Sequence, residues 1–349
     1  MQEGFPFKKK IVNRYYPINY GGDGRYLWDI ARVDKTVTVI DLASNTTVAT
    51  IPVASINDWV IGNYVPADKC LYVHYNAGHY KIDLDPSSGT FCTVLANNSN
   101  FPQSNSGNSI SYWQPLDAFI GVSNELTMIP RLSPSSSSLL FTGPKNVIVG
   151  AAQNLGWMAQ GGVNPTQLTG WINLNTGKRI GIGSSNSFVA PVINRRFLIE
   201  FSEYDENNIY IRTVNTSGYQ APYVLEFCPR SKRLIGGGGN GSGWRLSVID
   251  HKLFTLVGNT PYVSTPGAPA AWGYQYRNVV FSPYTGMVYA RSYYHAGNVT
   301  DIHIYDCTLA LASMYQGYLV SGNDRVPAVT SYQNGTMGLN RLKNDEHYY

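Results

Sequence analysis

The chain has 349 residues, of which 43% are hydrophobic and only 14% charged, and its formal net charge is +4. An average soluble domain is roughly 25% charged, so most of the polarity here comes from Asn, Ser, Thr, Gly and Tyr. This composition, with 26 tyrosines and 34 glycines, argues against long surface helices, and the thinly spread positive charge argues against a nucleic-acid-binding stripe.

The first 22 residues precede any repeated pattern, and they contain the one dense basic run, at 8–10. These lysines follow the first apolar residues and have no long apolar segment behind them, so we expect neither a signal peptide nor a membrane span. We interpret residues 1–22 as an arm, or as a strand that closes a ring, and expect it to contact a partner through Tyr15, Tyr16 and Tyr20.

Residues 35–53, KTVTVIDLASNTTVATIPV, form the clearest pattern in the chain. Apolar and polar residues alternate up to Asp41, residues 44–46 supply turn chemistry, and a second alternating run continues to Pro52. This arrangement predicts a β-hairpin.

The same unit, an apolar strand, an Asp or Asn, a turn and a second strand, recurs at 79–95, 169–183, 245–258 and 301–314. Its polar marker residue recurs at intervals of 42, 90, 77 and 56 residues, which fit a repeat of about forty residues. Degenerate copies are therefore expected near 127–131 and 209–214. The markers are Asp41, Asp83, Asn173, Asp250 and Asp306, and we expect the aspartates to accept hydrogen bonds from backbone N–H groups two residues further on.

A second phrase, a proline-containing turn followed by an inner strand, occurs at 65–75, 132–143, 226–237 and 281–292. Two hairpins per repeat make a four-stranded sheet, and such a repeat buries its apolar faces only by stacking on its neighbours around an axis. We therefore predict an all-β fold, a single β-propeller of six or seven four-stranded blades at residues 23–318, followed by a C-terminal arm at 319–349.

The phrase VTVIDLASNTTVATIPV at 37–53, with the later proline-turn strands, resembles the YVTN-type β-propeller repeat. The resemblance implies a fold more than a role, because that family includes secreted and surface-bound binding proteins, and some lactone-cleaving enzymes share the architecture. In composition and architecture the chain is also similar to the propeller proteins of the tail nozzle or tail tip of short-tailed bacteriophages. No shared motif allows individual residues of the two to be matched.

Four histidines flank two expected turns and are the weak candidates for a metal site. Paired polar residues across a hairpin are more often hydrogen-bonded, so we predict no metal and no cofactor. The candidate ligands are His74, His79, His295 and His303, with Asp83 and Asp301 nearest to them.

The glycine-rich stretch 236–243 leads into a strand and lacks the Lys of a phosphate-binding loop, so it predicts a hairpin tip. The four cysteines lie in apolar runs without metal-binding spacing and are expected to be buried free thiols. Outside a cell, Cys70 and Cys92 are the pair that could be bridged across neighbouring strands.

The sequence contains no nucleophile elbow, and its carboxylates are scattered. We therefore expect a non-enzymatic structural component of a virion, such as a bacteriophage tail nozzle or tail-tip propeller, made in the host cytoplasm and assembled as a homo-oligomeric ring with other structural proteins. The alternatives are a secreted or surface propeller that binds glycan or protein and, third, a metal-dependent, lactonase-like hydrolase. Besides the N-terminal tyrosines, the expected partner contacts are Trp272, Tyr274, Tyr276, Tyr348 and Tyr349.

Overall fold

The structure is a computed structural model of the chain. It describes residues 22–342 except 57–59, 76–77, 100–108, 123–124, 134, 143–146, 153–156, 162–168, 175, 177, 184–188, 194–195, 200–201, 206, 214–224, 241–242, 254, 264–275, 293–299 and 323–335.

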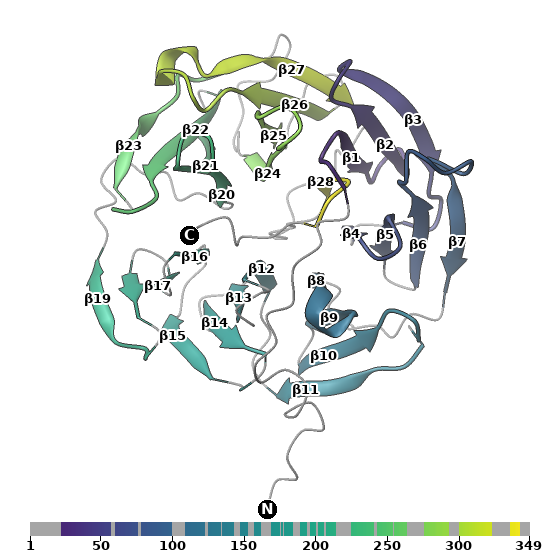
Figure 1. Cartoon of the computed structure of the whole chain (residues 1–349), viewed down its shortest axis with the longest axis horizontal. Helices are drawn as coiled ribbons and strands as arrows, with labels where there is room; N and C mark the ends of the chain where they lie inside the picture. The colour runs from purple at the N-terminus through teal and green to yellow at the C-terminus, as the bar shows by residue number, and fades with distance from the viewer. Residues whose placement is uncertain are drawn as a thin grey trace, which may run out of the picture.

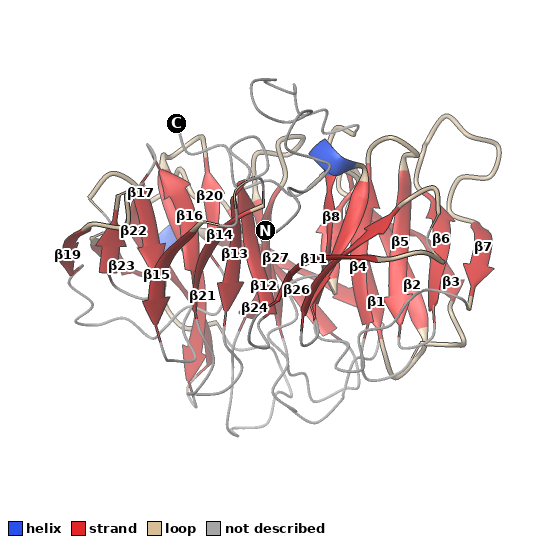
Figure 2. Ribbon diagram, turned by 90° about the horizontal axis from the view of Figure 1, so that it is seen from below, coloured by secondary structure: helices blue, strands red, loops and turns tan. Residues whose placement is uncertain are grey.

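The described residues form seven four-stranded antiparallel sheets, arranged radially around one centre (Figure 1). Seen from the side, the strands stand next to one another in a single ring-shaped layer (Figure 2). The fold is therefore a seven-bladed β-propeller, which confirms the predicted fold class and fixes the number of blades at the higher of the two expected values.

The strands are numbered in chain order and run from the innermost to the outermost within each blade (Figure 1). Blade 1 consists of β28 (Met337–Leu339), β1 (Tyr26–Ala31), β2 (Thr36–Asp41) and β3 (Thr46–Pro52); blade 2 of β4 (Val60–Val65), β5 (Cys70–Tyr75), β6 (Gly78–Asp83) and β7 (Val94–Asn98); blade 3 of β8 (Ser109–Trp113), β9 (Ala118–Val122), β10 (Glu125–Pro130) and β11 (Ser138–Thr142); blade 4 of β12 (Val147–Ala152), β13 (Trp157–Gly161), β14 (Thr169–Asn173) and β15 (Arg179–Gly183). Blade 5 consists of β16 (Val189–Ile193), β17 (Arg196–Ile199), β18 (Ser202–Tyr204) and β19 (Tyr210–Thr213); blade 6 of β20 (Leu225–Cys228), β21 (Arg233–Asn240), β22 (Gly243–Asp250) and β23 (Leu256–Asn259); blade 7 of β24 (Tyr276–Phe281), β25 (Val288–Ser292), β26 (Thr300–Tyr305) and β27 (Tyr315–Ser321).

The ring is closed by the C-terminal segment, because β28 pairs with β1 as the innermost strand of blade 1. The backbone N–H of Asn340 donates to the Tyr26 carbonyl at 2.8 Å, and Trp28 Nε1 donates to the Leu339 carbonyl at 3.0 Å. Gly338 lies directly beneath the Trp28 indole, where any Cβ would collide with the ring. The assignment of 319–349 to an arm therefore needs correction: β27 crosses the boundary at 318 and residues 336–342 belong to the propeller.

In blades 1, 2, 6 and 7 the turn between the third and fourth strands is organised by the marker aspartate. Backbone N–H groups two residues further on donate to the side chains of Asp41, Asp83, Asp250 and Asp306 at 2.8–2.9 Å, as predicted. In blade 5 the same role falls to Asp205, four residues before the predicted 209–214, which instead overlaps β19.

The turn between the first and second strands uses left-handed backbone. Lys69, Asp117 and Lys232 have φ values of 53°, 47° and 53° and each directly precedes the second strand of its blade. Proline-turn phrases at 65–75, 226–237 and 281–292 occupy this position. The phrase at 132–143 does not: it leads into β11, an outermost strand, because a Ser- and Pro-rich turn looks the same at either hairpin.

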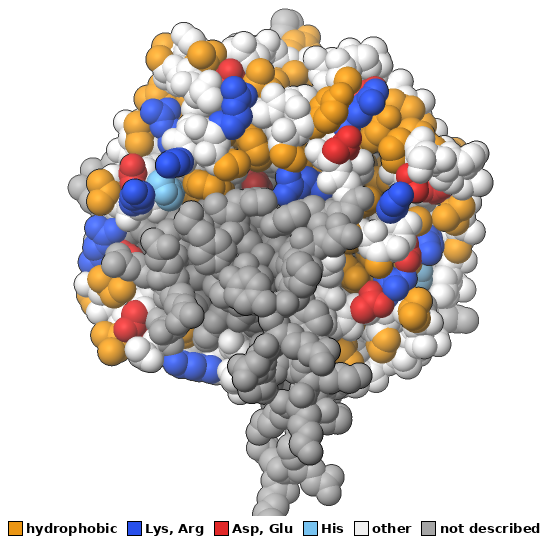
Figure 3. Space-filling model, in the orientation of Figure 1, with side chains coloured by type: hydrophobic (Ala, Val, Ile, Leu, Met, Phe, Trp, Pro, Cys, Tyr) orange, Lys and Arg blue, Asp and Glu red, His pale blue; other side chains and the backbone are white. Residues whose placement is uncertain are grey.

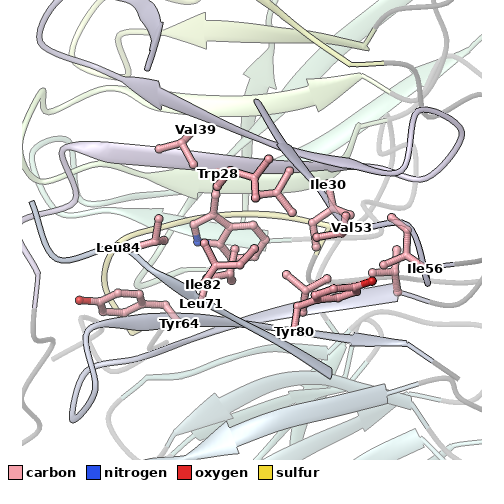
Figure 4. Close-up of a cluster of buried hydrophobic side chains, with 14 of the residues drawn as sticks. Trp28, Ile30, Val39, Val53, Ile56, Tyr64, Leu71, Tyr80, Ile82 and Leu84 are labelled. Atoms are coloured by element: carbon pink, nitrogen blue, oxygen red, sulfur yellow. The ribbon is translucent and has the colours of Figure 1, made fainter. Parts of the chain in front are cut away.

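The apolar core lies between neighbouring blades. Figure 4 shows the layer between blades 1 and 2, where Trp28 and Val39 face Leu71 and Ile82 and all four are buried. Similar clusters join blades 2 and 3, 3 and 4, 6 and 7, and 7 and 1. At these five interfaces one sheet covers the face of the next, which is how a short repeat removes its apolar surface from water.

Helix in the described part of the chain is limited to short 3-10 turns at Gln114–Leu116 and Leu311–Ser313. Within the same residues, no helix has the length and apolar character needed to cross a membrane.

Candidate functional site

Tyr276 is the one predicted partner-contact residue that the structure describes, and its position overturns that prediction. Its side chain is 0% exposed and lies in the core between blades 6 and 7. Gly237 of β21 is packed so closely that an added Cβ would lie 2.7 Å from Tyr276 Cβ. The remaining predicted contacts, Tyr15, Tyr16, Tyr20, Trp272, Tyr274, Tyr348 and Tyr349, lie outside the described residues.

Tyr276 is held by a buried polar network. Its hydroxyl lies 2.5 Å from His303 Nδ1 and 2.6 Å from the Tyr305 hydroxyl, and Trp244 meets the His303 ring edge-on. Burial, with the neighbouring Tyr305, raises the pKa of Tyr276 well above its ordinary value, so it stays a neutral phenol. The network ties β24 to β26 and is explained by packing within the core.

The other histidine pair lies in blade 2. His74 and His79 are directly opposite each other on β5 and β6, with ring centroids 5.8 Å apart, and both are buried beside Tyr72 and Phe119. Burial and the adjacent His79 lower the pKa of His74, and burial and Lys81 lower that of His79 to about 4. Both rings are therefore neutral near pH 7.

Within the residues that the structure describes, no third ligand joins this pair. Asp83, the nearest candidate, accepts hydrogen bonds from the Asp85 backbone N–H and the Thr90 hydroxyl in its own turn. Across the described residues, no three His, Cys, Asp or Glu side chains gather in a way that could hold a metal ion. His295 lies outside those residues, so its predicted pairing with His303 has no test here.

A buried ion pair joins the two ends of the ring. Arg291 of blade 7 and Asp29 of blade 1 are both almost fully buried and form a salt bridge. Ser321 Oγ donates to Asp29 Oδ2 at 2.7 Å, and Arg291 Nη2 donates to the Ile30 carbonyl at 3.2 Å. The salt bridge and these two hydrogen bonds tie blade 7 to blade 1 through buried groups.

A second ionic network links blades 2 and 3. Arg131 contacts Asp68 at 2.5 Å and holds Asp117 through Nε at 2.6 Å and Nη2 at 2.9 Å, while Lys81 reaches Asp68 at 2.8 Å. Burial opposes ionisation of both aspartates, but the bonds from these cations and from Tyr72 and Tyr112 outweigh it and lower their pKa values. No periodic signal in the sequence points to this network. At the position of Asp83 and Asp250, blade 3 carries Pro130, and Arg131 follows it.

The outer rim of blade 5 carries the longest run of consecutive exposed large apolar residues in the part of the chain that the structure describes. Ile209, Tyr210 and Ile211 are consecutive and are 60%, 53% and 41% exposed, and Leu253 of the adjoining turn is 56% exposed. Arg212 connects the two segments, since its Nη2 donates to the Leu253 carbonyl at 2.9 Å while its Nε bonds the buried Glu203. We call these four apolar residues the blade 5 rim.

Charge, by contrast, is not concentrated. Figure 3 shows basic and acidic side chains distributed around one face of the ring and next to one another. Ion pairs of opposite charge include Arg25 with Asp41, at 2.6 Å, and Lys69 with Asp85, at 2.7 Å. On the part of this face that the structure describes, there is no basic stripe of the kind that binds nucleic acid.

No family model matches the chain, and no curated protein matches it either. Solved structures do share its fold. The chain is similar to the dihydro-heme d1 dehydrogenase NirN, solved in complex with DHE, with 12% identity over 89% of this chain and 77% of that one, at a TM-score of 0.55. It is also similar to a functionally unknown protein from Desulfotomaculum acetoxidans, with 9% identity, coverages of 90% and 98% and a TM-score of 0.61.

A third similar structure is a hypothetical selenium-binding protein from Sulfolobus tokodaii, with 10% identity, coverages of 86% and 92% and a TM-score of 0.60. At these identities the likeness concerns the fold alone. Propellers of this kind occur in an enzyme and in proteins of unknown function, so the fold does not select between those roles.

Proposed function

We propose that this propeller is a non-catalytic structural component of a virion, of the kind found in bacteriophage tail nozzles or tail tips. It acts by binding other structural proteins of the particle and copies of itself in a ring. In this proposal the chain is made in the host cytoplasm and functions within the released particle.

The blade 5 rim is the observation that carries the proposal. Large apolar side chains on an outermost strand lower the solubility of a free monomer and are favourable once a partner covers them. The order β16-β17-β18-β19 leaves the outer edge of β19 without a further strand in the described part of the chain. Exposed side chains and an open backbone edge together suit docking of another chain.

A lysate that contains assembled particles provides the test. We expect the chain to sediment with the particles in a density gradient and to be protected there from added protease. A chain found only as a free 38.6 kDa monomer, in a lysate with intact particles, would overturn the proposal.

Substitution of the rim sharpens the test. Changing Ile209 and Ile211 to Thr and Tyr210 to Ser should reduce incorporation at least tenfold while leaving the fold intact. Leu132→Ser is the matched control, because Leu132 is 77% exposed in the turn after β10 and lies away from the rim. Equal incorporation of both variants would exclude the rim as the docking surface.

We also propose that the chain is related to proteins with the YVTN-type repeat. It is supported by β2 and β3, which form the hairpin of the phrase at 37–53 around the turn that Asp41 organises. An alignment of relatives in which this hairpin recurs in several blades would support the assignment, and its restriction to blade 1 would count against it.

A catalytic or ligand-binding role is the second candidate, because a structure similar in fold is that of a dihydro-heme d1 dehydrogenase. Titration of the purified chain with haem, followed by absorbance, tests the cofactor class to which that name points. Saturable one-to-one binding would favour this candidate, and a linear response without saturation would remove its main support. A secreted propeller that binds glycan is tested separately on a glycan array.

A further inference from the structure

Two of the four cysteines meet where blades 6 and 7 pack together. Cys228 is the last residue of β20, and Cys307 follows the marker Asp306 after β26. Both side chains are fully buried and belong to the same apolar cluster. Each thiol also shifts the pKa of the other. The two buried side chains therefore interact where the blades meet.

The turns around this pair hold it in place. Arg230, two residues after Cys228, donates through Nη1 to the Gly286 carbonyl of blade 7 at 3.2 Å. Gly286 has a φ of 72°, and any Cβ there would collide with the Arg230 side chain. On the other side, the Asp306 backbone N–H bonds the Met314 carbonyl at 2.8 Å. The first contact holds the turn after Cys228 against blade 7, and the second holds the turn of blade 7 that carries Cys307.

The two sulfurs differ in acidity. The hydrogen bond from Cys307, aided by the backbone N–H groups of Ser231 and Arg230, lowers the pKa of Cys228 to about 6 against the opposing effect of burial. The same hydrogen bond, together with burial, raises the pKa of Cys307. Cys228 is therefore the more acidic thiol of the two.

The other two cysteines lack this arrangement. Cys70 is buried and Cys92 half-buried in blade 2, and both are free thiols. Burial raises the pKa of each to about 11, so they remain protonated and unreactive near neutral pH. They serve as internal controls for the chemistry of blades 6 and 7.

We propose that Cys228 and Cys307 are a modification site: a dithiol that hydrogen peroxide oxidises to a disulfide joining blade 6 to blade 7. The Cys228 thiolate attacks one peroxide oxygen, the O–O bond breaks, and the departing oxygen takes a proton and leaves as water. Cys228 is then a sulfenic acid. The sulfur of Cys307 attacks it, the S–O bond breaks, and the hydroxyl leaves as a second water with the proton from Cys307.

Two thiols and one peroxide thus give one disulfide and two waters, with two electrons passing from sulfur to oxygen. The bond would hold blades 6 and 7 together through a covalent link between the innermost strand of one and the third-strand turn of the other. This inference does not depend on the proposed assembly role, because it concerns only the two thiols and an oxidant.

Buried thiols react only when the structure opens. The proposal is therefore tested with two treatments, one on the folded chain and one that includes unfolding. In one, the folded full-length chain is treated with hydrogen peroxide. In the other, the chain is unfolded, reduced and refolded in a buffer of reduced and oxidised glutathione. After alkylation under denaturing conditions, we expect a cross-linked peptide pair containing Cys228 and Cys307, with Cys70 and Cys92 alkylated, and a thermal unfolding midpoint raised by several degrees.

Matched variants separate the chemistry from stability. In Cys307→Ser, peroxide should leave Cys228 as a sulfenic acid that dimedone traps, whereas Cys70→Ser should still form the cross-link. Four alkylated cysteines after both treatments, or a cross-link between any other pair, would overturn the proposal.

Discussion

The interface between blades 1 and 2 and the rim of blade 5 contain the same kinds of residue with opposite exposure. Val39, Tyr64 and Ile82 are buried in the first, whereas Ile209, Tyr210 and Ile211 are exposed in the second. Because the blades radiate from one centre, the space between them widens outward (Figure 1). Inner and middle strands therefore have a neighbouring blade on each side, whereas an outermost strand does not. Radial position, more than residue type, decides whether an apolar side chain is buried.

Removing the central side chain of the buried interface should have the largest effect. Trp28 is buried among Leu71, Ile82 and Leu84 and also bonds the closing strand. Trp28→Ala should lower the free energy of unfolding by about 3–5 kcal/mol, measured by guanidinium unfolding followed by circular dichroism. A loss below about 1 kcal/mol would mean that the interface contributes little to closing the ring.

Breaking the buried ion pair should cost a similar amount for a different reason. Arg291→Met leaves Asp29 buried without its counter-ion, and we expect a loss of about 3–5 kcal/mol. Adding Asp29→Asn to this variant should restore much of that loss, because the stranded charge is removed. If the double variant is no more stable than Arg291→Met alone, charge burial is not the cause.

As the pH falls, the two buried histidines of blade 2 should lower the free energy of unfolding at pH values above those at which most carboxylates become protonated. The folded state holds His74 and His79 neutral, with pKa values below the ordinary 6.5. Between pH 6.5 and about 4 the unfolded chain binds more protons than the folded one, so stability falls as the pH falls. For His79 the loss is on the order of 3 kcal/mol.

Unfolding midpoints measured across this pH range check the slope. His79→Leu should flatten it. An unchanged slope in His79→Leu would assign the acid sensitivity to other groups.

Relieving backbone strain should have a smaller effect of opposite sign. Lys232 has a φ of 53°, in the left-handed region that a side chain disfavours. Lys232→Gly should raise the free energy of unfolding by about 0.5–1 kcal/mol, and Lys232→Val should lower it. Chemical denaturation of both variants gives the comparison, and equal stabilities would argue against strain at this turn.

The rim should show the smallest effect on stability. Tyr210→Ser removes a half-exposed ring from the edge strand of blade 5, and we expect a change within about 0.5 kcal/mol. Comparing this change in the free energy of unfolding with that of Trp28→Ala shows how strongly radial position determines the stability contribution of an aromatic side chain. A loss comparable to that of Trp28→Ala would show that the rim is part of the core.

Local sequence patterns were sufficient to predict those structural features that depend on residues close together in the chain. The alternation at 35–53 predicted β2 and β3, and the Asp markers predicted turns whose hydrogen bonds reach two residues along the chain. His74 and His79 were expected to flank a turn, and they pair across the hairpin of β5 and β6. Interactions between residues that are close in the chain can be predicted from the order of the residues.

The candidate functional residues were harder to predict. Tyr276 stands in an aromatic stretch that resembles an exposed loop, yet its hydroxyl is held by His303 and Tyr305 in the core. The stretch 236–243 predicted a hairpin tip, and β21 and β22 do pair as far as Asn240 and Gly243. The glycines at 236–239 nevertheless lie within β21, where Gly237 packs closely against Tyr276. Each side chain is positioned by a neighbouring strand or blade, and sequence spacing does not report such contacts.

The amino-acid sequence by itself determined the all-β class, the repeat of strand pairs and the turn chemistry, because these follow from alternation and from bonds between near neighbours. Only the tertiary structure decided that there are seven blades, that β28 closes the ring on β1, that Asp29 meets Arg291, and which apolar residues remain in water. Those outcomes depend on which sheets come face to face around the axis. Residues hundreds of positions apart then determine each other's surroundings.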